Sequence, residues 1–192
     1  MTVTRKNLRL KHFDYSQSGA YFITVCVQDR VCLFGNVTDG MMQLNEASQV
    51  VLQTWQGLLG RVPAIELDEF VVMPNHVHGI LHIVRAPLMA PVAPEPTASE
   101  PSGAMNRAST LGEMVRTFKA ASTRAIRQQV LPSFAWQRNY YEHIIRNIDE
   151  LTSIRTYIVN NPLQWSLDRE NPAAKGRLGL IDFTAIFGRD LP

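Results

Sequence analysis

The chain has 192 residues, with 19 Lys and Arg against 17 Asp and Glu, and a sequence pI of about 8.7. Hydrophobic residues make up 45% of it, which is ordinary for a globular protein and enough for one core. The chain has two cysteines without CxxC spacing, so we expect no disulfide scaffold. The basic N-terminus has no apolar run behind it, so we expect no signal peptide. No apolar run reaches membrane-spanning length, so we expect no transmembrane helix. We expect a cytoplasmic protein without membrane contact, and its mildly basic balance permits nucleic-acid binding.

The first thirteen residues form a basic arm with no acidic side chain. Such an arm is either solvated or held against phosphate groups, and the composition leaves both interpretations open. The cations concerned are Arg5, Lys6, Arg9 and Lys11.

Hydrophobic patterning predicts the elements that follow. Residues 20–27 are β-branched and aromatic and predict a buried strand, whereas residues 29–40 are typical of a turn or loop. Apolar residues recur at helical spacing over 44–59. Two more apolar runs, 66–73 and 77–84, predict two strands or one hairpin.

Two histidines lie where the second of these runs begins, in the sequence Pro74-Asn75-His76-Val77-His78-Gly79. Residues two apart on a strand point to the same face of the sheet. Two imidazoles side by side on a strand supply half of a divalent metal site. An isolated pair of this kind can equally be structural, so the remaining ligands decide the interpretation.

The composition changes at residues 86–109, where five prolines fall among small and polar residues. Such a segment has little to bury, and we predict a flexible insertion within one domain that spans residues 1–165. The tail at 166–192 is expected to dock on this domain, because it carries the apolar side chains Ile181, Phe183, Ile186 and Phe187.

Residues 110–129 predict an amphipathic helix with a basic face. Its cations lack acidic partners apart from Glu113, so this face either is solvated or contacts a phosphate backbone. They are Arg116, Lys119, Arg124 and Arg127.

The last elements are a strand-like aromatic segment at 134–146 and a helix from Asn147 to Asn161, which ends before Pro162. Asn147 followed by Glu150 is a capping-box pattern. The order of the elements predicts an α+β sandwich, with an antiparallel sheet covered by helices mainly on one face.

On this last helix, Tyr157 and Asn161 are four residues apart and share one flank beside the apolar stripe. An amide oxygen is a suitable ligand for a hard cation, so Asn161 can add to the two histidines. A bound cation that polarises a phosphodiester would let a tyrosine of ordinary pKa attack phosphorus and form a covalent intermediate. By residue type alone, Tyr140 and Tyr141 are alternative nucleophiles, although strand packing explains them.

Together these pieces resemble the single-tyrosine HUH transposases, in particular their REP-associated branch. The resemblance covers roughly residues 8–165 in the family's order. It rests on Tyr21-Phe22-Ile23-Thr24, Val72-Met73-Pro74-Asn75-His76-Val77-His78, the segment from Trp136 to Arg146, and Tyr157-Ile158-Val159-Asn160-Asn161-Pro162.

The resemblance implies a ferredoxin-like, RRM-like HUH nuclease fold with the histidines on a central strand. It implies Mg²⁺ or Mn²⁺ at His76 and His78 with Asn161 as third ligand, although many relatives carry Gln at that position. Tyr157 is then the nucleophile that forms a 5′-phosphotyrosine link and releases a 3′-OH. The implied substrate is single-stranded DNA beside a palindromic hairpin. The chain acts as a monomer or a homodimer, and Tyr157 serves its own or a partner's site.

Three further side chains have two interpretations each. His143 and His82 either support the metal ligands from behind or serve elsewhere in the fold, and Trp136 either stacks on a base or packs in the core. Two other functions compete with a transposase. A rolling-circle initiator or relaxase would circularise an origin substrate, and a non-catalytic hairpin binder would bind without cleaving.

Overall fold

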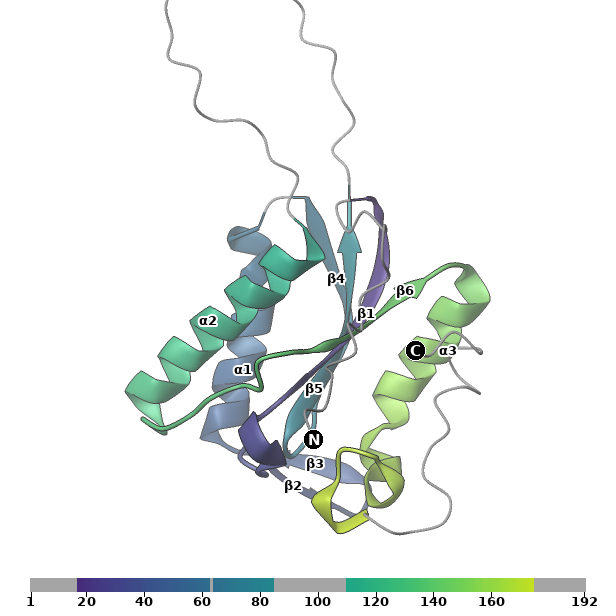
Figure 1. Ribbon diagram of the computed structural model, residues 1–192. Coiled ribbons are helices and arrows are strands. Elements are labelled where there is room, and N and C mark those ends of the chain that lie inside the picture. Colours follow the sequence, from purple (N-terminus) through teal and green to yellow (C-terminus); the bar gives the residue numbers. More distant parts are fainter. Residues whose placement is uncertain (1–16, 63, 85–109, 175–192) are drawn as a thin grey trace, which may run out of the picture.

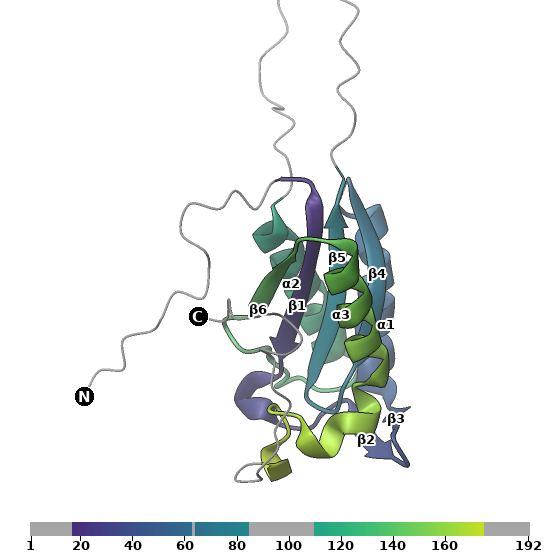
Figure 2. The ribbon, with the colours of Figure 1, turned by 90° about the vertical axis from the view of Figure 1, so that its right-hand side faces the viewer.

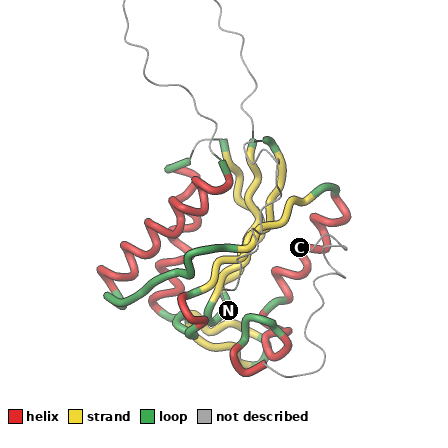
Figure 3. The backbone as a smooth tube through the Cα atoms, viewed as in Figure 1, coloured by secondary structure: helices red, strands yellow, loops and turns green. Residues whose placement is uncertain are grey.

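The computed structural model describes residues 17–62, 64–84 and 110–174. Predictions made for the basic arm, for the 86–109 insertion and for residues 181–187 therefore lie outside the described residues. The centre of the fold is a four-stranded antiparallel sheet in the order β4-β5-β1-β6 (Figures 1 and 3). Its strands are β1 (Gly19–Cys26), β4 (Ile65–Val72), β5 (His76–Ile83) and β6 (Tyr141–Ile145).

In the described part of the chain, three α-helices cover the sheet. Helices α1 (Glu46–Gln56) and α2 (Leu111–Gln129) pack together on one face, and α3 (Ile148–Asn160) lies across the other (Figures 1 and 2). This arrangement confirms the predicted α+β class with an antiparallel central sheet. The expectation of helices mainly on one face holds for two of the three, since α3 buries the second face. Among the described residues, no helix has the length and apolar character needed to cross a membrane.

Each α-helix begins at a polar capping residue. Asn45 and Asn147 accept hydrogen bonds from the third helical backbone N–H of α1 and α3, and Thr110 forms a complete capping box with Glu113. The box predicted at Asn147 is only half formed. Glu150 accepts a hydrogen bond from the backbone N–H of Arg146 instead of that of the cap.

Alternation along the two central strands builds a core on each face. On β1, Tyr21, Ile23 and Val25 belong to the core beneath α1 and α2, whereas Phe22 belongs to the smaller core beneath α3. Because β5 alternates in the same way, its buried Ile80 joins the core beneath α3. His76 and His78 share the strand parity of Ile80 and therefore face α3.

Two segments differ from the sequence-based expectation. Residues 29–40, predicted as loop, contain β2 (Gly35–Thr38), which forms a hairpin with β3 (Met41–Leu44). The hairpin turns at Asp39 and Gly40, both at positive φ. The strand predicted over 134–146 is regular only in β6, and the residues before it contribute one isolated bridge, Val27 to Trp136.

Short 3₁₀ turns complete the description. They are η1 (Gln28–Arg30), η2 (Gly57–Gly60), η3 (Pro162–Leu167) and η4 (Pro172–Ala174). Residues 162–174, which include the first part of the predicted tail, lie at the same end of the molecule as the β2–β3 hairpin (Figure 1). Buried Asp168, Glu170, Asn171 and Ala174 show that this part of the chain packs against the domain.

An ion-pair cluster ties α3 to the sheet. Arg155 of α3 donates to both carboxylate oxygens of Asp68 of β4, from Nε at 2.9 and 3.2 Å and from Nη2 at 2.7 Å. His82 Nε2 of β5 lies 2.7 Å from the same carboxylate. Burial by itself would raise the pKa of Asp68, but the hydrogen bonds from Arg155 and His82 outweigh it and lower this pKa to about 2.

Replacing Asp68 with asparagine should remove one component of the acid sensitivity of folding. A carboxylate whose pKa is lowered in the folded state stabilises above its unfolded pKa of 3.8 and loses that contribution as the pH falls towards 2. Asp68→Asn should reduce the free energy of unfolding at pH 7 by about 1–2 kcal/mol, since Arg155 is partly exposed. In denaturant titrations between pH 5 and pH 2, the free energy of unfolding of Asp68→Asn should fall less steeply with decreasing pH than that of the wild type. Glu69→Gln, at the exposed neighbour, should show the wild-type pH dependence. A wild-type pH dependence in Asp68→Asn would contradict the assignment.

Candidate metal and nucleophile site

The predicted histidine pair lies at the start of β5 on the face covered by α3. Both rings are buried, with 0% and 1% of His76 and His78 exposed, and their Nε2 atoms are 3.0 Å apart. Two ligands at right angles around an ion, each about 2.1 Å from it, would also lie about 3.0 Å apart. The spacing of these two nitrogens therefore fits a shared cation.

Asn75 fixes the tautomer of His76. Its Nδ2 donates to the carbonyl oxygens of Arg30 at 2.9 Å and Glu170 at 2.8 Å, which sets the orientation of the amide. Oδ1 of Asn75 therefore faces His76 Nδ1, at 2.8 Å, and must accept its proton. The Nε2 atom of neutral His76 is thus left with a lone pair directed at the site.

His78 is held from the neighbouring strand. Thr24, its register partner on β1, places Oγ1 2.8 Å from His78 Nδ1, and the ring stacks on Phe22 at a centroid distance of 5.3 Å. Burial lowers the pKa of His76 to about 4, and burial with repulsion from His76 lowers the pKa of His78 well below its ordinary value. Both rings are neutral at neutral pH, as metal ligands must be.

Tyr157 brings its hydroxyl from α3 to this pair, with Oη 3.2 Å from His78 Nε2. The side chain is 5% exposed and packs edge-on against Phe22 at 6.1 Å. Burial, and secondarily the charge of Asp168, raises the pKa of Tyr157 above its ordinary value, and the nearby Asn161 amide acts in the opposite direction. A phenolate here therefore needs a cation close by.

Asn161 caps the C-terminus of α3 and is completely buried beside Tyr157. Its side-chain oxygen and nitrogen make no hydrogen bond that satisfies strict geometry among the described residues. The structure thus brings the four residues predicted for the site to one place, and the predicted ligand set is His76, His78 and Asn161.

Sequence reasoning missed a further member of this cluster, Asp168. Its Oδ2 lies 3.8 Å from His76 Nε2, and the ligand atoms of His76, His78 and Asp168 all lie within 4.8 Å of one another. Burial raises the pKa of Asp168 to about 6. This buried group of two imidazoles and one carboxylate can bind a metal ion. No sequence spacing connects Asp168 to the histidines. The chain from Asn161 through η3 brings Asp168 back to them.

The other histidines predicted near the site hold α3 instead. His143 Nε2 lies 2.6 Å from Glu150 Oε1 and ties β6 to the first turn of α3, while His82 joins the Asp68 cluster. Tyr141 packs edge-on against Phe22 at 6.2 Å, and burial raises its pKa to about 12. Tyr140 packs against the core beneath α1 and α2.

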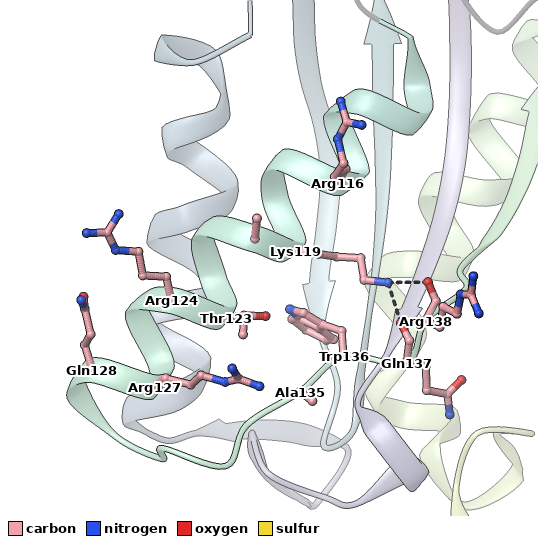
Figure 4. A pocket seen from close by; sticks show the side chains of 11 residues that line it. Arg116, Lys119, Thr123, Arg124, Arg127, Gln128, Ala135, Trp136, Gln137 and Arg138 are labelled. Carbon is pink, nitrogen blue, oxygen red and sulfur yellow. Dashed lines mark hydrogen bonds between the residues drawn. The ribbon is translucent and has the colours of Figure 1, made fainter.

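The basic face of α2 lines an open groove of about 740 Å³ together with residues 135–138 (Figure 4). Helix α2 covers the face of the sheet opposite to α3 (Figure 1). The histidines face α3, where His78 meets Tyr157. Of the predicted cations, Lys119 donates to the carbonyl oxygens of Gln137 and Arg138, and Arg127 donates to that of Phe134. Arg116 and Arg124 also line the groove. We name this surface the α2 groove.

The surroundings of Trp136 show that its side chain packs in the core. The side chain is 7% exposed, and its Nε1 donates to Ser122 Oγ at 2.9 Å. Its ring contacts Phe34, Phe118 and Phe134 at centroid distances of 5.3, 5.8 and 5.1 Å. The indole thus packs in the core with these three rings, and the residue also lines the α2 groove.

Comparisons with known proteins place the chain among its relatives. It is 40% identical to an uncharacterised protein of Haemophilus influenzae over 168 residues, which cover 86% of this chain and 92% of that protein. It is 26% identical to a Haemophilus influenzae protein provisionally named a REP-associated tyrosine transposase, over 79% of this chain and 74% of that one. No protein-family model matches.

A solved structure agrees in fold. It is that of a REP-associated tyrosine transposase bound to a REP hairpin, with a TM-score of 0.52 and 20% sequence identity, over 85% of this chain and 74% of the other. The sequence relatives, this shared fold and the ordered motifs of the chain agree. The chain therefore resembles the REP-associated tyrosine transposases, through the sequence of one named relative and through its fold.

Proposed function

We propose that the protein is a metal-dependent single-stranded DNA endonuclease and strand transferase that acts beside palindromic hairpins. The observation that supports this most directly is the meeting of Tyr157 with the histidine pair, 3.2 Å from Tyr157 Oη to His78 Nε2. The solved relative is bound to a REP hairpin, which supports DNA of that class as the substrate.

In the proposed reaction, Tyr157 Oη forms a bond to the phosphorus of one phosphodiester as the bond from phosphorus to the 3′ oxygen breaks. The products are a 5′-phosphotyrosine and a free 3′-OH. The proton balances, since the phenol loses one and the departing oxygen gains one. A later attack by another 3′-OH reverses the step and joins a new strand. Because Tyr157 is 5% exposed, a strand reaches Oη only when the residues covering it move aside.

A bound Mg²⁺ or Mn²⁺ would polarise the phosphate and stabilise the charge that develops on it. His76 and His78 would hold it through Nε2, with oxygen from Asn161 or Asp168. Asn75 and Thr24 keep the two imidazoles in the orientation and tautomer that this binding needs. Tyr157 meets the histidines of its own chain, which supports attack in cis.

The test is incubation of the protein with single-stranded DNA that carries the palindromes flanking its own gene, in the presence of Mn²⁺. A covalent protein–DNA adduct that resists denaturation is expected, together with a new 3′-OH end. Binding of the hairpin without an adduct would overturn the catalytic assignment and favour a hairpin binder. Circularisation of a plasmid origin substrate would favour a rolling-circle initiator.

The α2 groove is the proposed binding surface for the phosphate backbone of the hairpin. Replacing Arg116, Arg124 and Arg138 with glutamine should weaken hairpin binding, because three cations of this groove are removed. The slope of log K against log salt should fall by about 0.9 for each phosphate that the variant no longer neutralises. Fluorescence anisotropy over a range of NaCl concentrations measures both. Arg61→Gln, at an exposed position after η2, is the matched control, and an unchanged slope in the triple variant would remove the groove from the interface.

A further inference from the structure

We propose that Asp168 is the anionic ligand of the metal site, and that Asn75 and the Arg30–Glu170 pair set its position. This inference rests on the metal dependence of the proposed function. It adds to the predicted ligand set a residue that lies on the segment after η3 and outside the motifs of the family resemblance.

The two oxygens of Asp168 have different surroundings. Oδ1 accepts a hydrogen bond of 2.6 Å from the backbone N–H of Glu170. Oδ2 is buried, makes no hydrogen bond that satisfies strict geometry among the described residues, and lies 3.8 Å from His76 Nε2. The whole residue is 1% exposed. Burial raises the pKa of Asp168 and outweighs the neighbouring Asn161 amide, which lowers it, so the charged carboxylate is costly here. A cation shared with the histidines would offset that cost.

The donor set favours the carboxylate over the amide as the principal oxygen ligand. Asn161 Oδ1 is also buried and lacks a hydrogen bond of strict geometry, so it can approach the same ion. An amide is neutral, however, whereas Asp168 supplies a negative charge that attracts a hard divalent cation. Two imidazoles and one carboxylate also leave coordination positions open for a substrate phosphate.

The Asn75 amide connects the histidine motif to the backbone two residues after Asp168. Asn75 Nδ2 donates to the carbonyl oxygen of Glu170, and Asn75 Oδ1 accepts from His76 Nδ1. The side chain of Glu170 is held in turn by an ion pair with Arg30 and a contact of 3.5 Å from Cys26 Sγ. The residue that orients His76 therefore also positions the backbone that presents Asp168. Glu170 and Arg30 are positioning residues in this arrangement, because they act through Asp168.

The test is Mn²⁺ binding by the full chain, measured by calorimetry and by the EPR signal of free Mn²⁺. Asp168→Asn keeps the shape of the side chain and should weaken Mn²⁺ binding at least about tenfold. Without metal, this variant should melt no lower than the wild type, because it removes a buried charge. The rise in Tm that Mn²⁺ gives the wild type should shrink accordingly. A variant that only damaged the fold would lower the metal-free Tm instead.

Glu170→Gln tests the positioning role. It retains the backbone carbonyl that Asn75 contacts but loses the ion pair with Arg30, so a smaller loss of Mn²⁺ affinity is expected, with a normal far-UV spectrum. Glu66→Gln, at an exposed position on β4, should bind as the wild type does. Mn²⁺ binding by Asp168→Asn at wild-type affinity would overturn this inference and leave the proposed function standing. Failure of the wild type to bind Mn²⁺ would overturn both.

Discussion

Replacing Tyr157 with phenylalanine is expected to abolish the covalent protein–DNA adduct while hairpin binding is retained. The phenyl ring keeps the edge-on packing against Phe22, and the fold loses the hydrogen bond between the hydroxyl and His78, about 1 kcal/mol. The reaction loses its attacking atom, and single-turnover cleavage should fall by about 10⁴-fold or more. Denaturing gels with labelled single-stranded DNA and Mn²⁺ measure the adduct.

Tyr141→Phe is the matched control for this variant. Tyr141 also packs edge-on against Phe22 on the α3 side of the sheet, so its change has a similar effect on packing without touching the proposed nucleophile. Adduct formation should persist in Tyr141→Phe, and hairpin affinity in both variants should remain within about twofold of wild type. An adduct formed by Tyr157→Phe would show that another residue is the nucleophile and would contradict the assignment of Tyr157.

Local signals in the sequence were sufficient for the helices and the four sheet strands. The capping residue Asn147 placed the start of α3 within one residue, because an N-cap side chain satisfies a backbone N–H at the helix end. Amphipathic periodicity placed the start of α2 equally well. The apolar runs around the histidine motif became β4 and β5, as their length and composition predicted. The β2–β3 hairpin was missed although its Asp39-Gly40 turn is a known signal, since its strands are only four residues long.

The parts of the site that depend on long-range contacts were beyond sequence reasoning. Tyr157 and Asn161 could be placed on one flank of α3, because helical spacing is a local property. The position of Asp168 in the site depends on how the chain turns after Asn161. No repeating pattern in the sequence predicts that turn. The basic face of α2 shows the same limit. The sequence offered no acidic partner for Lys119 and Arg127 on their own helix apart from Glu113. In the structure, both donate to carbonyl oxygens of the segment before β6.

Removing the histidine pair should reduce adduct formation as much as removing the tyrosine does, and it should also abolish metal binding. His76→Ala with His78→Ala is expected to eliminate Mn²⁺ binding and adduct formation together, because both nitrogen ligands are lost. Chelation of the wild type with EDTA should reproduce the loss of adduct, and added Mn²⁺ should restore it. Calorimetry measures metal binding, and denaturing gels measure the adduct.

The double variant creates cavities in a buried site, so a milder change keeps this prediction testable. Thr24→Val removes only the hydroxyl that orients His78, and should weaken Mn²⁺ binding by about 10–100-fold in a folded protein. His82→Ala, on the same strand and face but bonded to Asp68, should bind Mn²⁺ normally. Normal metal-dependent cleavage by the His76 and His78 double variant would remove the metal hypothesis.

Mixing the two inactive proteins tests whether the tyrosine and the histidines act within one chain. Tyr157 Oη lies beside His78 of its own protomer, so the Tyr157→Phe protein and the double-histidine variant should not restore each other. No adduct is expected at any mixing ratio, because neither protein holds a complete site. Adduct formation in the mixture would show that a tyrosine from one copy reaches the histidines of another. Exchange of α3 between two copies would then be required, and the ion pair between Asp68 and Arg155 would have to form across that interface.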